Sequence, residues 1–180
     1  MALDDQQWRA LLGGDGLLRE GALAAPPLES AYAVLASQPG TRVDVGQWSA
    51  HAERFFRTRL GLTVDKRYDG EPPEVDAARV VVAPHGEPGG VRLVFARPRE
   101  PPDLAFAELG EARAGGGGII LVARRCKTVW LVVRESDDDR LALQLATVLA
   151  SVLLGPVLDV RGPDLYGVKT ARGKLEARGG

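Results

Sequence analysis

The stretch GIILVARRCKTVWLVVRESDDDRLALQLATVLASVLLG, residues Gly118–Gly155, decides the fold. It opens with two apolar runs, 119–123 and 129–133, which are rich in β-branched and aromatic residues. Only residues 124–128 lie between them. Because both runs are apolar throughout instead of alternating, they predict a β-hairpin whose strands are buried on both faces.

An apolar helix is predicted next, over residues 141–154. Ser136 is a suitable N-cap, and the aspartates at 137–139 suit the positive end of the helix dipole. Gly155 and Pro156 predict the end of the helix. Its few polar residues are spaced by three and four and so share one narrow stripe. They are Gln144, Thr147 and Ser151.

A helix that is apolar around most of its circumference is either enclosed by its own domain or shared with a second chain. It is too short to cross a bilayer, which needs about 20 such residues. If two copies share the helix, a partly hydrated seam at a two-fold axis would contain the polar stripe. The interface candidates are Gln144, Thr147, Val148 and Ser151, and the expected assembly is a homodimer.

The composition is that of a globular protein, with 45% hydrophobic and 26% charged residues in a chain of 180. A net charge of −1 gives no overall basic field that would favour nucleic acid or a membrane surface. The single cysteine, Cys126, fits a reducing compartment, and the N-terminus lacks the pattern of a signal peptide. We therefore expect a cytoplasmic protein, and the abundance of Ala, Gly, Pro and Arg is typical of GC-rich bacteria.

Three regions are expected along the chain. Residues 1–42 form a helical appendage, with helices near 3–12 and 28–35, and residues 163–180 form a basic, mobile tail. The core, residues 43–162, has the order α-β-β-β-α-β-β-α. Its first helix is capped by Asp44 and runs to Leu60, and further elements are expected at 62–64, 79–83, 91–96, 101–112 and 157–160. This order predicts an α+β fold in two layers, with a largely antiparallel sheet of five to six strands.

No motif with a specific chemistry stands out. The glycine run 115–118 follows a helix and precedes a strand, the reverse of a phosphate-binding loop, so it is interpreted as a helix terminator. Cys126 has basic neighbours that favour a thiolate and is the candidate reactive thiol. A catalytic pair would require His51 or His85 nearby, and an ordinary cysteine at a strand end is the favoured interpretation. We expect no metal site and no cofactor.

The order of elements over residues 44–134 resembles that of PD-(D/E)xK nucleases. The resemblance implies an acid at the start of the second core strand, a position that Glu74 or Asp76 would match. It also implies a metal-binding acid on the third strand, where the chain reads Phe95-Ala96-Arg97. A required ligand is therefore missing, which predicts a degenerate fold without hydrolytic activity that binds nucleic acid. Loop residues in solvent are the simpler interpretation of the carboxylates at 71–76.

The same order also resembles type III secretion chaperones and related regulators. That resemblance implies a non-enzymatic, dimeric protein that grips a segment of a protein partner. A basic patch at Arg54 and Arg57 is a further candidate, although a solvated helix face explains it as well. We expect a protein-interaction or regulatory module, more plausibly non-enzymatic than an enzyme, with nucleic-acid binding as the alternative and no membrane insertion.

Overall fold

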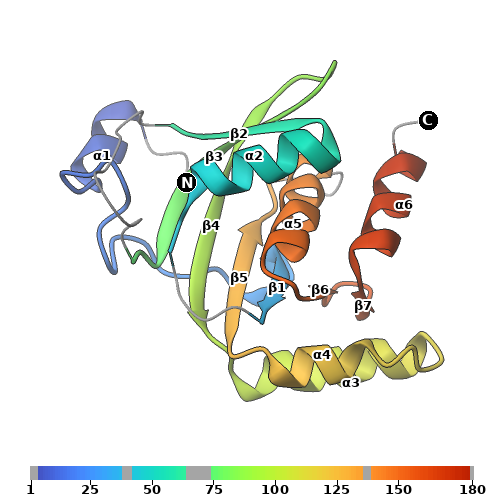
Figure 1. Ribbon diagram of the computed structural model, residues 1–180. Helices are drawn as coiled ribbons and strands as arrows, with labels where there is room; N and C mark the ends of the chain where they lie inside the picture. The colour runs from blue at the N-terminus through green and yellow to red at the C-terminus, as the bar shows by residue number, and fades with distance from the viewer. Residues whose placement is uncertain (1–3, 38–41, 64–73, 136–138, 179–180) are drawn as a thin grey trace.

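The computed structural model describes residues 4–37, 42–63, 74–135 and 139–178. Within these residues, one antiparallel sheet of seven strands has the order β2-β3-β4-β5-β1-β6-β7 (Figure 1). The strands are β1 (Ala31–Ala36), β2 (Thr58–Leu62), β3 (Ala77–Pro84), β4 (Gly90–Pro98), β5 (Thr128–Val133), β6 (Val157–Asp159) and β7 (Asp164–Tyr166). The α+β class is thus confirmed, with a sheet slightly larger than expected.

Helices cover both faces of this sheet. They are α1 (Asp5–Ala10), the 3-10 turn η1 (Leu28–Ser30), α2 (Val45–Phe56), α3 (Pro101–Arg113), α4 (Ile119–Arg125), α5 (Arg140–Val152) and α6 (Val168–Arg178). On one face α5 lies over β1 and β5, with α2 and α6 beside it (Figure 1). Trp48 of α2 meets Trp130 of β5 edge-on in this core, with ring centroids 5.2 Å apart.

The other face is covered by α3, α4 and the N-terminal segment. Its core includes Leu18, Phe95, Leu131 and Leu158, all almost fully buried. Gly110 of α3 sits so close to β7 that a Cβ there would lie 2.7 Å from the main-chain nitrogen of Leu165. Because both faces are covered, β5 is apolar throughout, and its residues 129–132 have no exposed surface. The prediction of a strand buried on both faces is confirmed there.

The predicted secondary structure is wrong for two elements. Residues 119–123 form helix α4, not the first strand of a hairpin, and Cys126 is its C-cap. Only one side of α4 packs on the core, through Ile119, Ile120 and Ala123. Residues 31–36, expected within a helix, form β1, which is buried on both sides between β5 and β6. A central strand has no polar face, so its apolar run mimics a helix.

The structure also corrects the prediction of a mobile C-terminal tail. After residue 163 the chain adds β7 to the sheet edge and then forms α6. Leu165, Tyr166, Ala171 and Leu175 are buried there. The charged residues on the outer side of α6 hide this pattern, because only two of its eleven residues are buried.

Helix boundaries agree in part with the sequence prediction. Asp44 caps α2 as predicted, accepting from the amide of Gln47, but α2 ends at Phe56 and Leu60 belongs to β2. The predicted cap Ser136 and residues 137–138 lie outside the described residues, as do residues 64–73. Asp139 is the N-cap of α5 and accepts from the amide of Ala142.

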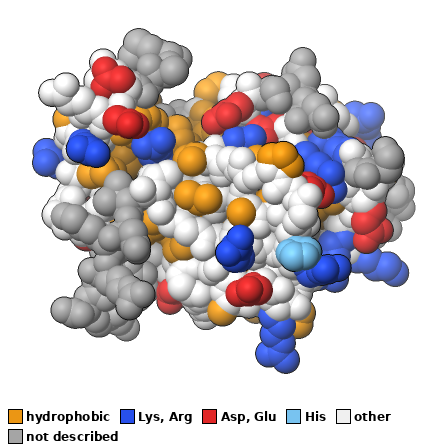
Figure 2. Space-filling model, turned by 90° about the horizontal axis from the view of Figure 1, so that it is seen from above, with side chains coloured by type: hydrophobic (Ala, Val, Ile, Leu, Met, Phe, Trp, Pro, Cys, Tyr) orange, Lys and Arg blue, Asp and Glu red, His pale blue; other side chains and the backbone are white. Residues whose placement is uncertain are grey.

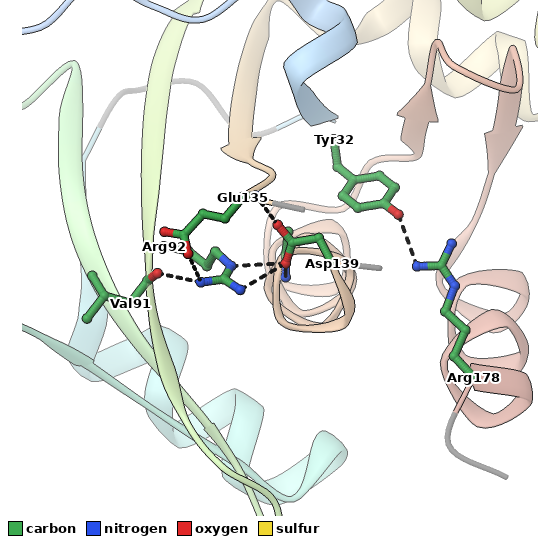
Figure 3. Close-up of polar contacts among 7 residues, drawn as sticks. Tyr32, Val91, Arg92, Glu135, Asp139 and Arg178 are labelled. Atoms are coloured by element: carbon green, nitrogen blue, oxygen red, sulfur yellow. Dashed lines mark hydrogen bonds and ion pairs between the residues drawn. The ribbon is translucent and has the colours of Figure 1, made fainter. Parts of the chain in front are cut away.

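A buried ion pair fixes the start of α5. Arg92 of β4 donates through Nε to Asp139 at 3.0 Å, and Glu135 lies 3.1 Å from the same guanidinium group (Figure 3). The Asp139 side chain is 1% exposed and the Arg92 side chain 11%. On the far side of α5, Arg178 of α6 donates to the hydroxyl of Tyr32 (Figure 3). Polar contacts therefore connect α5 and α6 to the sheet.

Candidate functional site

The polar stripe of α5 faces other parts of the same chain. Gln144 donates to the Thr58 hydroxyl of β2 at 2.8 Å, and Ser151 lies 2.8 Å from His51 of α2. Thr147 donates to the carbonyl of Leu143 and has no exposed surface. Val148 has no exposed surface either. Thr147 and Val148 are thus covered within one chain, whereas Gln144 and Ser151 are partly exposed.

The end of α5 has an unusual backbone. Leu154 adopts φ 55°, a left-handed conformation that usually belongs to glycine at this position. The next residue, Gly155, lies against β1, where a Cβ would be 1.5 Å from the Leu35 carbonyl oxygen. Its amide closes the helix by donating to the carbonyl of Ala150. The left-handed position therefore falls on a leucine, and Leu154 is 63% exposed.

Leu154 borders a shallow apolar groove of about 410 Å³ between α4, the end of α5 and the start of α6. None of its lining residues is charged. They are Ile119, Val122, Ala150, Ser151, Leu154, Gly155, Pro156, Gly167 and Val168. Val122 is 41% exposed, and Leu121 beside it is 59% exposed. Exposed apolar residues gathered in one place mark interaction sites more often than scattered ones do.

Basic residues neighbour the lining residues of this groove in the chain. Arg125 follows Val122 by three residues on α4, and Lys169 follows Val168 on α6; both are exposed. Arg172 and Arg54 act on His51, the partner of Ser151 in the groove wall. The lining itself is apolar. A ligand with apolar residues and acidic flanks would complement it.

Ser151 and His51 form a pair that resembles the nucleophile and base of hydrolases. Burial, followed by the positive charges of Arg172 and Arg54, lowers the pKa of His51 and favours its neutral form. However, Ser151 is the hydrogen-bond partner that the structure shows for the imidazole of His51, so no carboxylate orients the ring within the described residues. Ser151 also lies within α5, whose amides bond to the helix itself, so the pair lacks oxyanion donors. It is interpreted as a contact between α2 and α5.

The surroundings of Cys126 are not those of a reactive thiol. Its sulfur has no exposed surface and lies 3.3–3.4 Å from the carbonyl oxygens of Val122 and Leu35 and from the Ser37 hydroxyl. Burial raises its pKa, and this outweighs the hydrogen bond from Ser37 and the charge of Arg99. The basic neighbours in the sequence, Arg125 and Lys127, point to solvent.

The nuclease-like positions do not form a charged cluster. Phe95 of β4 is 5% exposed and packs in the core beneath α3. Asp76 accepts from the amide of Gly21 at 3.0 Å, while its other carboxylate oxygen is buried without a partner. Arg97 pairs with Asp103 at 2.7 Å. Among the described residues there is no group of three metal-ligating side chains.

The two members of the predicted basic patch have different surroundings. Arg54 lies over the ring of Phe55, whereas Arg57 lines a polar cleft at the C-terminus of α2. Seen from above, Lys and Arg side chains gather toward the side of α6 but alternate with acidic ones (Figure 2). No sequence pattern had indicated the exposed apolar residues Leu154 and Val122 or the groove beside them. Leu154 could have been found, because it lies three residues beyond Ser151 and so continues the spacing of the polar stripe.

No protein family, curated protein or solved structure matches this chain. No helix among the described residues is long and apolar enough to span a bilayer.

Proposed function

We propose that this chain is a non-enzymatic protein-interaction module, bacterial and cytoplasmic, whose apolar groove receives an apolar segment of a partner protein. The observation that carries the proposal is Leu154, an exposed leucine in a left-handed backbone conformation. This conformation costs a non-glycine residue about 1–2 kcal/mol. Such strain gathers at binding sites in proteins, where the side chain has a use that offsets it.

The groove also defines the chemistry of the partner. Its apolar lining favours a segment that projects leucine-like side chains at helical spacing, as in other helix-in-groove complexes. Arg125 and Lys169, exposed neighbours of the lining residues in the chain, favour acidic residues on the partner. We therefore expect an amphipathic helix with acidic flanks, which would bury Leu154 and Val122 on binding.

The test uses the variant Leu154→Gly, which removes the side chain and also relieves the backbone strain. Wild type, Leu154→Gly and the control Leu109→Ala are immobilised and exposed to lysate of the native host. Leu109 is 47% exposed on α3 and does not line the groove. We expect a protein whose recovery drops about tenfold, or about 1.4 kcal/mol, with Leu154→Gly only. A synthetic peptide of its acidic amphipathic helix must then bind wild type and not Leu154→Gly.

Equal recovery by all three proteins would contradict the proposal. A lower melting temperature of Leu154→Gly would also contradict it, because the strain argument requires this variant to be at least as stable as wild type. A second copy of the chain is the alternative occupant of the groove. Self-association remains a prediction, and light-scattering chromatography of wild type and Leu154→Gly tests whether the groove carries it.

A degenerate nuclease-like fold that binds nucleic acid remains the second candidate function. The exposed Arg54 and Arg57 favour it, as does the run of α2, β2, β3, β4 and α3 in the expected order. Binding of a short DNA duplex that is lost in the double variant Arg54→Gln/Arg57→Gln, and retained in Leu154→Gly, would favour this candidate over the groove.

A further inference from the structure

A polar cleft lies where α2 passes directly into β2. Its larger part has a volume of about 710 Å³ and continues into a hollow of about 380 Å³ beside α5 and α6. The two parts share Arg57, Pro84, His85 and Glu87. The larger part is also lined by Glu53, Thr58, Arg59, Ala83 and Gly86. A cavity of this size is typical of sites for small molecules.

Arg57 is the second non-glycine residue with a positive φ among the described residues, at 51°. It ends α2 by donating its amide to the carbonyl of Ala52, and β2 begins at the next residue. Its own carbonyl accepts from the amide of His85 at 2.8 Å. Glycine would serve this tight corner without strain, so the structure holds an arginine side chain at the cleft at an energetic cost.

The lining of the cleft brings three nitrogen-rich side chains together. Arg57, which precedes β2, Arg59 of β2 and His85, which follows β3, all line its larger part and are exposed. Thr58 pairs with Pro84 in the register, and the hydrogen bond from the His85 amide to the Arg57 carbonyl continues this pairing by one residue. Thr58 points the other way, where its hydroxyl accepts from Gln144.

The charges in the larger part of the cleft are unevenly paired. Glu87 is occupied by Arg140, at 2.8 Å. Arg57 and Arg59 have no acidic partner among the described residues, whereas Arg92, Arg97 and Arg134 each have one. Glu53, one turn before Arg57 on α2, is the remaining carboxylate of the lining. Two unpaired guanidinium groups therefore face one unpaired carboxylate.

We propose that this cleft binds a small phosphorylated molecule. The guanidinium groups of Arg57 and Arg59 hold the phosphate, because their planar forks match its oxygens. Glu53 accepts from a hydroxyl or amino group elsewhere on the same ligand. A nucleic-acid backbone fits less well, since its row of phosphates would meet the Glu53 carboxylate as well as the arginines. This site is independent of the apolar groove.

The test is an amide NMR titration of the whole chain with AMP, inorganic phosphate and adenosine at about 0.15 M ionic strength, where loose charge attraction is screened. We expect saturable shifts at Arg57, Arg59, His85 and Gly86 with AMP, weaker ones with phosphate, and none there with adenosine. Arg57→Gly and Arg59→Gln should each weaken AMP binding at least tenfold. Glu53→Gln should weaken AMP more than it weakens phosphate. Arg113→Gln, which removes an exposed arginine of α3, is the matched control and should change nothing.

Arg57→Gly must also melt no lower than wild type, because it relieves the left-handed strain. If AMP does not saturate these shifts at concentrations below about 10 mM, its binding free energy is less than about 3 kcal/mol in magnitude. That result would overturn the proposal. So would equal weakening by Arg113→Gln, or shifts of the same size with adenosine. Saturable binding of a short DNA duplex through Arg57 without binding of AMP would replace the small molecule with nucleic acid.

Discussion

His51 of α2 and Ser151 of α5 are joined by a hydrogen bond of 2.8 Å between Nε2 and the hydroxyl. The bond lies between two of the helices that cover one face of the sheet, and the His51 ring also packs on Phe55 with ring centroids 4.7 Å apart. Its surroundings disfavour the imidazolium form through burial and through Arg172 and Arg54, so the pKa of His51 falls below its ordinary value of 6.5. Stability should therefore depend on the protonation of this group.

The sign of this dependence follows from proton linkage. Between the lowered pKa of folded His51 and 6.5, the unfolded chain holds more protons than the folded one. The contribution to stability is complete above pH 6.5 and falls as the pH drops toward the folded pKa. Melting temperatures near pH 7.5 and pH 5.5 should differ less in His51→Gln than in wild type. His85→Gln, at an exposed histidine, is the control, and an unchanged pH dependence in His51→Gln would contradict the argument.

The polar stripe of α5 gives a second prediction. Thr147 is fully buried and its hydroxyl donates to the Leu143 carbonyl within the same helix. Thr147→Glu places an unpaired carboxylate in the core, which costs several kcal/mol, so we expect unfolding or aggregation and not a stable monomer. Thr147→Val, which keeps the shape, should remain folded. Circular dichroism of both variants checks this, and a folded Thr147→Glu protein would show that the stripe lies at a surface.

The C-terminal segment should contribute strongly to stability. Removal of residues 163–180 deletes β7 and α6 with four buried side chains, Leu165, Tyr166, Ala171 and Leu175. Leu175→Ala alone should cost about 2–5 kcal/mol, and a domain of this size loses about 2–4 °C per kcal/mol. Glu176→Ala, at the exposed neighbour, should melt within a degree or two of wild type. Thermal denaturation that shows equal melting of both variants would mean that α6 is dispensable.

How much of this architecture the sequence predicts depends on the element. The Asp44 cap, β5 and α5 were predictable, because a cap residue or a fully apolar strand leaves a local signal. Helix α4 was not, because its apolar run of five residues has too few turns to show a helical period. The prediction for strand β1 was wrong because Tyr32 and Leu35 happen to be spaced as on a helix, which gives a false helical period.

The candidate sites were less predictable than the fold. Arg57 was noticed as part of a helix face, but its cleft depends on the β2–β3 register and on the corner between α2 and β2. Leu154 belongs to the groove because Gly155 must pack against Leu35, a contact between residues far apart in the chain. Tertiary packing decides both, and local patterns do not report it. Cys126 shows the same effect in reverse, since its basic neighbours say nothing of the burial of its sulfur.

Cys126 itself gives a chemical prediction. Its pKa is raised by burial and its sulfur is fully enclosed, so a thiol reagent such as DTNB should react with the folded protein far more slowly than with the protein in denaturant. The reaction rate should follow the opening of the fold and rise in destabilised variants such as Leu175→Ala. Fast labelling of the native protein, at the rate of a free thiol, would mean that Cys126 is accessible.

The buried pair of Arg92 and Asp139 allows the last prediction, which separates a charge effect from a capping effect. Asp139 accepts from one charged group, the guanidinium of Arg92 at 3.0 Å, and from two main-chain amides, those of Ala142 at 2.9 Å and Glu135 at 2.5 Å. Asp139→Asn keeps a cap for α5 but leaves Arg92 without its charged partner, and breaking such a pair costs about 3–5 kcal/mol. Asp44→Asn at the exposed cap of α2 changes the charge alone and should cost well below 1 kcal/mol.

Arg92→Met/Asp139→Asn completes the comparison. Removing both charges leaves none unpaired near Asp139, so the double variant should recover a large part of the stability lost in Asp139→Asn. Glu135, at 64% side-chain exposure, then loses only a contact at the surface. Denaturant unfolding of wild type, Arg92→Met, Asp139→Asn and the double variant measures the coupling. If the losses of the two single variants simply add, then Arg92 and Asp139 contribute independently, and the pair does not fix the start of α5.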